Sequence, residues 1–423
     1  MKENSKTYVP TVAVIGAGAS GLAASIACMR TFKENSINAK VLLFESLPRC
    51  GKKILATGNG RCNLTNKFAE TTPYGGDKDF AKTVISQFTP HDTIDFFSSL
   101  GLLCRTEEEG RIYPMSSQAA SVLDALRFET ERLGCEIITD TKITSIKKNG
   151  KKFLLNNEFY ADAVILATGG KAAPKQGSDG SGYPLAQSLG HTVTKVYPAL
   201  VPLTAKGDFF RSLKGIRAEG NISMTLDGRK LRQENGEIQF TDFGISGIAV
   251  MQLSSAACVL TAKEKKPLIH IDFVPEISEK ELFSFILETA KKDSAAENLL
   301  SGIVPKRLGQ VIMKMSTSKP LTCSSKELTK GEISKAVQNL KDFTVEITGT
   351  RGFDNAQVCT GGIKCSEFDS KTMMSIITEN FFAAGEVLDV DGICGGFNLQ
   401  WAWASGIIAG KSAAERIIKN DKN

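Results

Sequence analysis

The sequence predicts an α/β protein with a parallel sheet, because short apolar strands and a helical segment alternate near the start of the chain. Residues 8–15 form an apolar run rich in β-branched side chains, which is typical of a buried parallel strand. A helical pattern over 22–32 and a second apolar run over 41–44 complete a strand–helix–strand order. Two later apolar runs, 163–166 and 381–384, are predicted as further strands.

Composition indicates a globular protein with more than one domain. The chain has 423 residues, of which 42% are hydrophobic and 23% charged, so it is long enough for two or three domains and a substantial core. Its formal net charge of +6 comes from lysines and arginines scattered along the chain. This pattern favours mild attraction for anionic ligands and predicts no nucleic-acid partner.

Cysteine and histidine positions argue against disulfides and metals. The ten cysteines have irregular spacing and no C-x-x-C pair, which favours reduced thiols in a cytoplasmic protein. His91, His191 and His270 are far apart in the sequence, so no histidine-based metal centre is expected.

Lys2 and Lys6 precede the small, apolar residues 12–29 and superficially resemble the start of a signal peptide. The glycines in that stretch argue against this interpretation, and no other uncharged run is long enough to span a membrane, so no membrane association is expected.

The turn after the first strand has a G-x-G-x-x-G pattern, Gly16-Ala17-Gly18-Ala19-Ser20-Gly21. Gly16 permits the tight turn, Gly18 lets backbone N–H groups approach a pyrophosphate, and Gly21 lets the helix pack closely on the strand. The helix N-terminus adds partial positive charge for the phosphates. Glu45, 24 residues after Gly21, lies where a carboxylate can accept both ribose hydroxyls of an adenosine. The pattern therefore predicts a dinucleotide site.

The motif alone does not choose between FAD and NAD, although Glu45 would repel the 2′-phosphate of NADP. Three glycine-rich segments, 51–66, 167–170 and 385–398, favour FAD. The first is dense in amides and cations that suit an anionic, heteroatom-rich ligand. The last leads into a helix N-terminus, which can stabilise the negative charge of a reduced flavin.

Together these segments resemble the HI0933-like flavoproteins, a family also described as the aminoacetone oxidase or bile-acid reductase type. The shared stretches are G-K-K-I-L-A-T-G-N-G-R-C-N-L-T-N at 51–66, A-T-G-G at 167–170, G-S-D-G-S-G-Y at 177–183 and G-E-V-L-D-V-D-G-I-C-G-G-F-N-L-Q-W-A-W-A-S-G at 385–406. The resemblance implies a Rossmann-type FAD-binding domain with a three-layer ββα architecture, made from residues 1–190 and 349–423. It also implies that an inserted substrate domain, β-barrel-like with helices, occupies residues 191–348.

Local patterns in the insert agree with this division. Strand-like runs occur at 220–226 and 267–273, helical runs follow at 279–291 and 306–315, and no cofactor motif lies among them. Family members often carry T-H-x-G-x-S-G-P, where this chain has T-D-F-G-I-S-G-I. Asp242 therefore stands in place of the family histidine, and the effect of that replacement is open.

The motifs and the resemblance together give a set of candidate ligands for non-covalently bound FAD. They are Gly16, Gly18, Ala19, Ser20, Gly21, Glu45, Lys53, Thr57, Gly58, Gly60, Arg61, Cys62, Asn63, Thr168, Gly169, Gly385, Glu386, Asp391, Gly395, Gly396, Asn398 and Leu399. Cys62 and Cys394 have no cysteine partner two residues away, so we expect them to be packing residues rather than a redox pair. The sequence assigns no catalytic residue.

Two enzymatic functions are compatible with these features, and a third function without turnover has little support. The first is a reductase that passes hydride from NAD(P)H through FAD to an activated C=C bond of a small organic, bile-acid-like molecule. Since no second G-x-G-x-x-G follows Gly21, NAD(P)H would dock only transiently. The second is an oxidase of a small amine such as aminoacetone, producing hydrogen peroxide. The third is a flavin-bound RNA-associated or regulatory protein. Substrate, nicotinamide preference and oligomeric state stay open.

Overall fold

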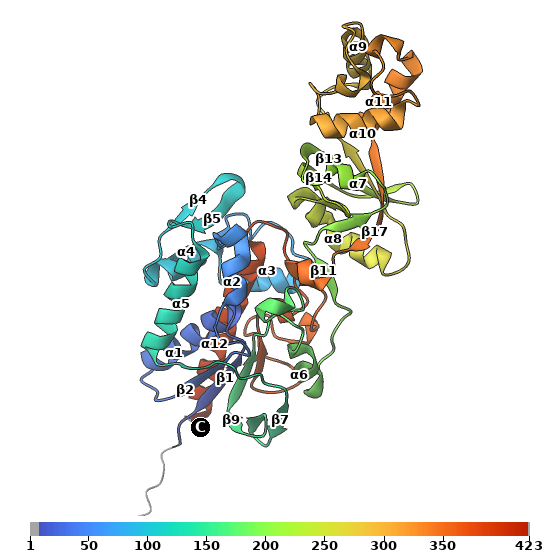
Figure 1. Cartoon of the computed structure of the whole chain (residues 1–423). Coiled ribbons are helices and arrows are strands. Elements are labelled where there is room, and N and C mark those ends of the chain that lie inside the picture. The colour runs from blue at the N-terminus through green and yellow to red at the C-terminus, as the bar shows by residue number, and fades with distance from the viewer. Residues whose placement is uncertain (1–7, 422–423) are drawn as a thin grey trace, which may run out of the picture. The chain divides into compact units, whose positions relative to one another are not determined.

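The computed structural model describes residues 8–421, so Lys2 and Lys6 lie outside the described residues. The chain divides into two compact units (Figure 1). The first unit contains residues 8–196 and 358–421, and the second contains residues 197–357. Both ends of the chain therefore build one unit, and the second unit is an insertion.

These divisions differ by a few residues from the boundaries expected at 191 and 348. Residues just after 191 still belong to the first unit, because the backbone N–H of Thr194 donates to Gly362 O at 2.8 Å. Residues just after 348 still belong to the second unit, because the N–H of Arg351 donates to Pro202 O at 3.2 Å. Backbone pairing between distant segments sets the boundaries, and that pairing has no local sequence signal.

A five-stranded parallel sheet forms the centre of the first unit, as the apolar runs predict. Its strand order is β19-β10-β1-β2-β6. The strands are β1 (Thr11–Ile15), β2 (Lys40–Phe44), β6 (Glu136–Ile138), β10 (Ala163–Leu166) and β19 (Phe381–Ala383). Val14 of β1 is in register with Leu43 of β2 on one side and Ile165 of β10 on the other. All five carboxyl ends therefore meet at one edge of the sheet.

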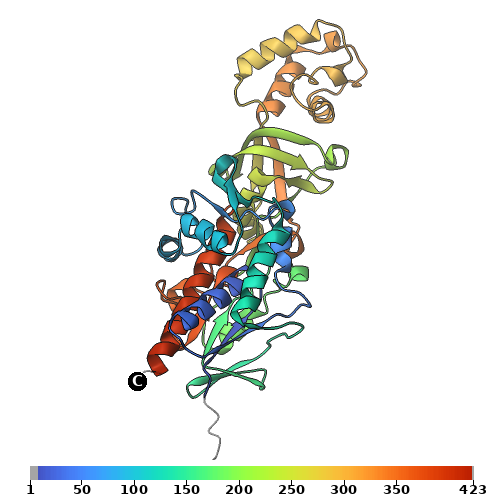
Figure 2. The same ribbon diagram turned by 90° about the vertical axis from the view of Figure 1, so that its left-hand side faces the viewer.

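Helices and a second sheet cover the two faces of this central sheet, which confirms the three-layer ββα architecture. Helices α1 (Ala19–Glu34) and α12 (Phe397–Asp421) lie side by side on one face (Figure 2). A meander of β7 (Ile146–Asn149), β8 (Lys152–Leu155) and β9 (Phe159–Ala161) packs on the other, with Phe44 and Phe159 edge to face at 4.9 Å. The remaining elements of this unit are α2 (Lys52–Ala56), β3 (Thr65–Asn66), α3 (Lys78–Gln87), α4 (Pro90–Ser99), β4 (Cys104–Thr106), β5 (Arg111–Pro114), α5 (Ala119–Leu133), α6 (Gly182–Ser188) and β18 (Val358–Thr360).

Contact between α1 and α12 is close because two glycines of α12 face the backbone of α1. A Cβ added at Gly406 would lie 2.4 Å from Ser20 O, and one added at Gly410 would lie 2.1 Å from Ala24 O. Either contact is far shorter than van der Waals distance. The helices can therefore approach this closely only with glycine at both positions.

The second unit is a closed barrel with added helices, in agreement with the expected insert. The barrel order is β12-β15-β14-β13-β16-β17. The elements of this unit are β11 (Tyr197–Ala199), β12 (Leu203–Ala205), α7 (Phe210–Leu213), β13 (Arg217–Leu226), β14 (Arg229–Phe240), β15 (Gly244–Ser246), α8 (Ile248–Thr261), β16 (Leu268–Asp272), α9 (Glu279–Ala290), α10 (Lys306–Ser316), α11 (Lys330–Lys341) and β17 (Phe343–Thr350). Its core, with Phe210, Phe240 and Phe343, is separate from that of the first unit. Among residues 8–421, no helix combines the length and apolar character needed to cross a bilayer.

Candidate cofactor site

The glycine turn after β1 has two glycines that packing requires and one that leaves space open. Gly16 has φ +102°, and a Cβ there would lie 2.5 Å from Ala167 O. A Cβ at Gly21 would lie 1.8 Å from Gly16 O. A Cβ at Gly18, in contrast, meets no heavy atom of the described residues within 4 Å. The space beside Gly18 fits the approach of a ligand phosphate to the backbone.

Helix α1 begins at Ala19 directly after this turn, and its N-terminus is open to an anion. Gly18 is the N-cap residue, and it supplies no side-chain hydrogen bond. The first turn of α1 contains no acidic side chain. No side chain of the helix's own first turn therefore neutralises its partial positive charge. Ser20 uses its hydroxyl to donate to Ala384 O at 3.4 Å, so its side chain braces the end of β19.

Glu45 follows β2 and is buried, with 8% of its surface exposed. Its Oε2 accepts from Ala17 N at 3.2 Å, and its Oε1 accepts from Leu47 N at 2.9 Å and from the Ser46 hydroxyl at 3.2 Å. An ionised carboxylate has about four acceptor positions. The three bonds therefore hold Glu45 beside the glycine turn and leave acceptor capacity for a ligand hydroxyl.

Three further contacts bring the segments 51–66 and 385–398 together with each other and with the start of α1. Lys53 Nζ lies 2.7 Å from Glu386 Oε2 in an ion pair between residues 333 positions apart. A Cβ at Gly396 would lie 2.9 Å from Asn63 Oδ1, and one at Gly385 would lie 2.5 Å from Ser20 Oγ. The N-terminal glycine turn and the loop before α12 therefore meet in the first unit.

Segment 51–66 is a short helix followed by a tight turn with several left-handed residues. Gly58, Gly60 and Cys62 all have positive φ, and the Thr57 hydroxyl donates to Ile54 O at 2.6 Å. The Arg61 guanidinium lies 4.1 Å from the centre of the Tyr113 ring and pairs with Glu107. The ring and the carboxylate hold the Arg61 side chain in place, and neither contact shows whether Arg61 binds a ligand.

Cys62 and Cys394 are not activated thiols. Burial raises the pKa of Cys62 to about 12, and burial also raises the pKa of Cys394. Both thiols are therefore protonated at neutral pH, and neither has the low pKa of a reactive cysteine. All ten cysteines are free in the structure.

Hydrogen bonds from nearby side chains fix the conformation of the loop before α12. Asn398 accepts from Gly392 N at 2.8 Å and donates to Gly392 O at 2.8 Å, so its amide braces the loop. Gly395 and Gly396 have φ of +121° and +101°, and Asn66 Nδ2 donates to Gly395 O at 3.0 Å. Asp391 O accepts from Gly75 N, and Leu399 lies half-buried in the first turn of α12. The Asn398 amide is therefore used within the loop itself.

Thr168 and Gly169 lie past the end of β10, beside the glycine turn. A Cβ at Gly16 would lie 2.9 Å from Thr168 Cα, and one at Gly182 would lie 2.0 Å from Thr168 Oγ1. Segment 177–183 therefore covers this strand end. Two hydroxyls of that segment, Ser178 Oγ and Tyr183 OH, are buried without a hydrogen-bond partner among the described residues. Sequence reasoning used the segment only as a family motif, although its glycine density was a usable signal.

Asp242 lies in the second unit, at the position where family members often have a histidine. It is exposed and pairs with Lys214 at 2.9 Å, and the hydrogen bond from Lys214 lowers the pKa of Asp242. A surface ion pair of this kind contributes little to stability.

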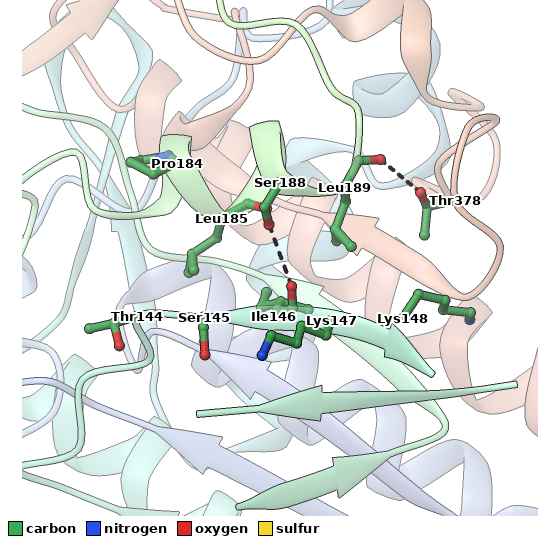
Figure 3. Close-up of a pocket in the computed structure, with 10 residues that line it drawn as sticks. All are labelled: Thr144, Ser145, Ile146, Lys147, Lys148, Pro184, Leu185, Ser188, Leu189 and Thr378. Carbon is green, nitrogen blue, oxygen red and sulfur yellow. Dashed lines mark hydrogen bonds between the residues drawn. The ribbon is translucent and has the colours of Figure 1, made fainter. Parts of the chain in front are cut away.

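A separate cavity of about 600 Å³ lies in the first unit between β7 and α6 (Figure 3). Ile146, Leu185 and Leu189 line it, and the Thr378 hydroxyl at its rim donates to Leu189 O at 2.9 Å. None of the candidate cofactor residues lines this cavity. It is therefore distinct from the site at the ends of β1, β10 and β19.

The chain matches a known family and curated relatives in sequence. The family model described as HI0933-like protein Rossmann domain matches residues 10–412. The chain is 41% identical to the 3-dehydro-bile acid delta(4,6)-reductase of Clostridium scindens, over 96% of this chain and 99% of the relative. It is 29% identical to the ribosomal RNA dihydrouridine synthase of Escherichia coli, over 95% and 98% of the two chains. A flavocytochrome c3 fumarate reductase structure, 16% identical, is similar with a TM-score of 0.49 and covers 97% of this chain and 79% of its own. The chain therefore belongs to the HI0933-like family and is a flavin-dependent oxidoreductase with a Rossmann domain.

Proposed function

We propose that this protein binds FAD non-covalently in its first unit and reduces a C=C bond that is activated by a conjugated carbonyl group. The observation that carries the proposal is the 41% identity to a bile-acid delta(4,6)-reductase, which extends over both units. The relative named as an RNA dihydrouridine synthase supports the same reaction type, because dihydrouridine is uridine reduced at a C=C bond conjugated to a carbonyl.

The residues at the sheet edge would each contact a different part of the cofactor. Glu45 would accept a ribose hydroxyl, and the backbone at Gly18 with the N-terminus of α1 would hold the pyrophosphate. The Gly395–Gly396 backbone and the N-terminus of α12 would face the flavin ring. When bound, FAD supplies hydride transfer at its N5 position. The chain's part is to orient the ring and to stabilise its charge, and we assign no general acid.

NAD(P)H is the proposed source of the hydride. Only one G-x-G-x-x-G turn precedes a helix of the first unit, and it belongs to the proposed FAD site. We therefore expect the nicotinamide to dock transiently and to leave before the substrate is reduced. The proposed substrate is a small organic molecule. A 3-oxo-Δ4 steroid is the first compound to be tested.

Anaerobic mixing of the purified yellow protein tests this proposal. We expect NADH or NADPH to bleach the visible flavin absorption, and a 3-oxo-Δ4 steroid to restore it in the absence of oxygen. Bleaching by aminoacetone alone, with peroxide formed on admission of air, would instead establish an amine oxidase. Re-oxidation by a uridine-containing RNA but not by the steroid would overturn both the small-molecule assignment and the expectation of no nucleic-acid partner. RNA is an arm of the experiment because two relatives are named as ribosomal RNA dihydrouridine synthases.

Replacing Glu45 by alanine is expected to weaken FAD binding by about 10- to 100-fold, as for loss of one charge-assisted hydrogen bond. The protein should still fold, because Glu45 is one polar group at a strand end. Titration of FAD into the deflavinated variant measures the effect. Glu136→Ala, an exposed glutamate at the start of β6, is the matched control and should retain wild-type affinity. Unchanged affinity in Glu45→Ala would place the adenosine elsewhere.

A further inference from the structure

Segment 177–183 crosses the edge of the central sheet where the glycine turn leaves β1. At one side, Gly180 N donates to Gly170 O at 2.9 Å, just past the end of β10. At the other side, a Cβ at Gly177 would lie 3.8 Å from Glu45 Oε1, just past the end of β2. Since β1 lies between β10 and β2, the segment spans the carboxyl end of β1. It is therefore the third wall of the site formed by the glycine turn and Glu45.

Ser178 lies within this wall, and its hydroxyl lies beside Gly169, one of the candidate cofactor residues. Its surface is 4% exposed, and its Oγ makes no hydrogen bond to the described residues. A Cβ at Gly169 would lie 2.9 Å from this oxygen. Gly169 has φ +72°, a conformation that also favours glycine there. The hydroxyl therefore packs directly against the Gly169 backbone, in the space that a side chain at position 169 would need.

Asp179, the residue after Ser178, is fully hydrogen-bonded within the protein. Asp179 Oδ1 accepts from Ser181 N at 2.9 Å, and Asp179 Oδ2 pairs with Lys142 Nζ at 2.7 Å. A buried hydroxyl without a partner is costly and therefore rare in native structures. Tyr183 OH, at the far end of the segment, also lacks a partner among the described residues. Ser178 is the one that follows Gly177, whose Cβ position lies 3.8 Å from Glu45 Oε1, so a molecule bound beside Glu45 can supply its missing partner.

We propose that Ser178 binds the adenosine diphosphate half of FAD, with its hydroxyl hydrogen-bonded to a ribose or phosphate oxygen beside Glu45. The inference rests on the proposed FAD site, and it adds a ligand from a third chain segment. A serine hydroxyl can both donate and accept, so it serves either oxygen type. The Glu45 carboxylate, after β2, and the Ser178 hydroxyl, in segment 177–183, then approach the same nucleotide.

The test is Ser178→Ala in the full-length protein, with two readouts on deflavinated material. We expect the FAD dissociation constant, measured by fluorescence titration, to rise about five- to tenfold, as for loss of one hydrogen bond. ADP, used as a competitor, should lose affinity by the same factor. The melting temperature of the FAD-free variant should equal or exceed that of the FAD-free wild type, because alanine removes an unsatisfied buried hydroxyl.

Ser181→Ala is the matched control in the same segment, because Ser181 is half-exposed. We expect it to bind FAD and ADP like the wild type. Wild-type affinity in Ser178→Ala, or an equal loss in both variants, would overturn the role of Ser178 while leaving the FAD proposal intact. A lower melting temperature of FAD-free Ser178→Ala with unchanged affinity would show a purely structural hydroxyl. Failure of the wild type to bind FAD would overturn the cofactor proposal itself.

Discussion

Replacing Gly18 by valine is expected to yield a folded but colourless protein. The residue has φ −85° and ψ −162°, an extended conformation that valine adopts readily. No heavy atom of the described residues lies within 4 Å of a Cβ at this position, so the added side chain costs the FAD-free protein little. The side chain would instead fill the space proposed for the pyrophosphate. We expect FAD affinity to fall by about 100-fold or more, equivalent to about 3 kcal/mol.

Absorption spectra of the purified variant and FAD titration measure this effect, and thermal unfolding of FAD-free protein checks the fold. Gly21→Val provides the contrast, because a Cβ there would lie 1.8 Å from Gly16 O. That variant should lose stability whether or not FAD is present. A Gly18→Val protein that retains stoichiometric FAD would contradict the assignment of the turn. A FAD-free Gly18→Val protein that melts well below the wild type would contradict the open space at this position.

Gly410→Val is expected to destabilise the first unit by about 3 kcal/mol, the upper range for overpacking a close contact. The reason is the distance of 2.1 Å between the new Cβ and Ala24 O, which is a backbone atom that cannot turn away. Helices α1 and α12 would have to separate. Since their N-termini are the proposed phosphate and flavin contacts, FAD affinity should fall together with stability.

Tryptophan fluorescence follows this unfolding selectively, because the chain has two tryptophans and both lie in α12. Trp401 and Trp403 are buried, and their ring N–H groups donate to Gly385 O at 3.0 Å and Leu64 O at 2.9 Å. Gly331→Val in α11 of the second unit is the control, because its nearest neighbour, Thr329 Oγ1, would be 3.8 Å from the Cβ. We expect that control to change stability by no more than about 0.5 kcal/mol. Equal melting curves for Gly410→Val and the wild type would show that α1 and α12 can move apart at little cost.

Much of the first unit was predictable because its signals are local. An apolar β-branched run, a glycine pattern and a helical period lie within a few dozen residues of one another, and the structure has β1, α1 and β2 in that order. The insert was also predictable as strands and helices, since β13, β16, α9 and α10 coincide closely with the runs expected at 220–226, 267–273, 279–291 and 306–315. Closure of the barrel was implied only by resemblance, because strand pairing is set by long-range register.

What the sequence by itself determined is the Rossmann turn, its acidic partner and the family to which the chain belongs. Only the tertiary structure decided that Lys53 pairs with Glu386, that Asn398 braces its own loop, and that the Ser178 hydroxyl has no hydrogen-bond partner within residues 8–421. The physical reason is distance along the chain. Backbone conformation and periodicity act between near neighbours, whereas hydrogen-bond partners and the space left for a ligand depend on segments that meet only when the fold closes.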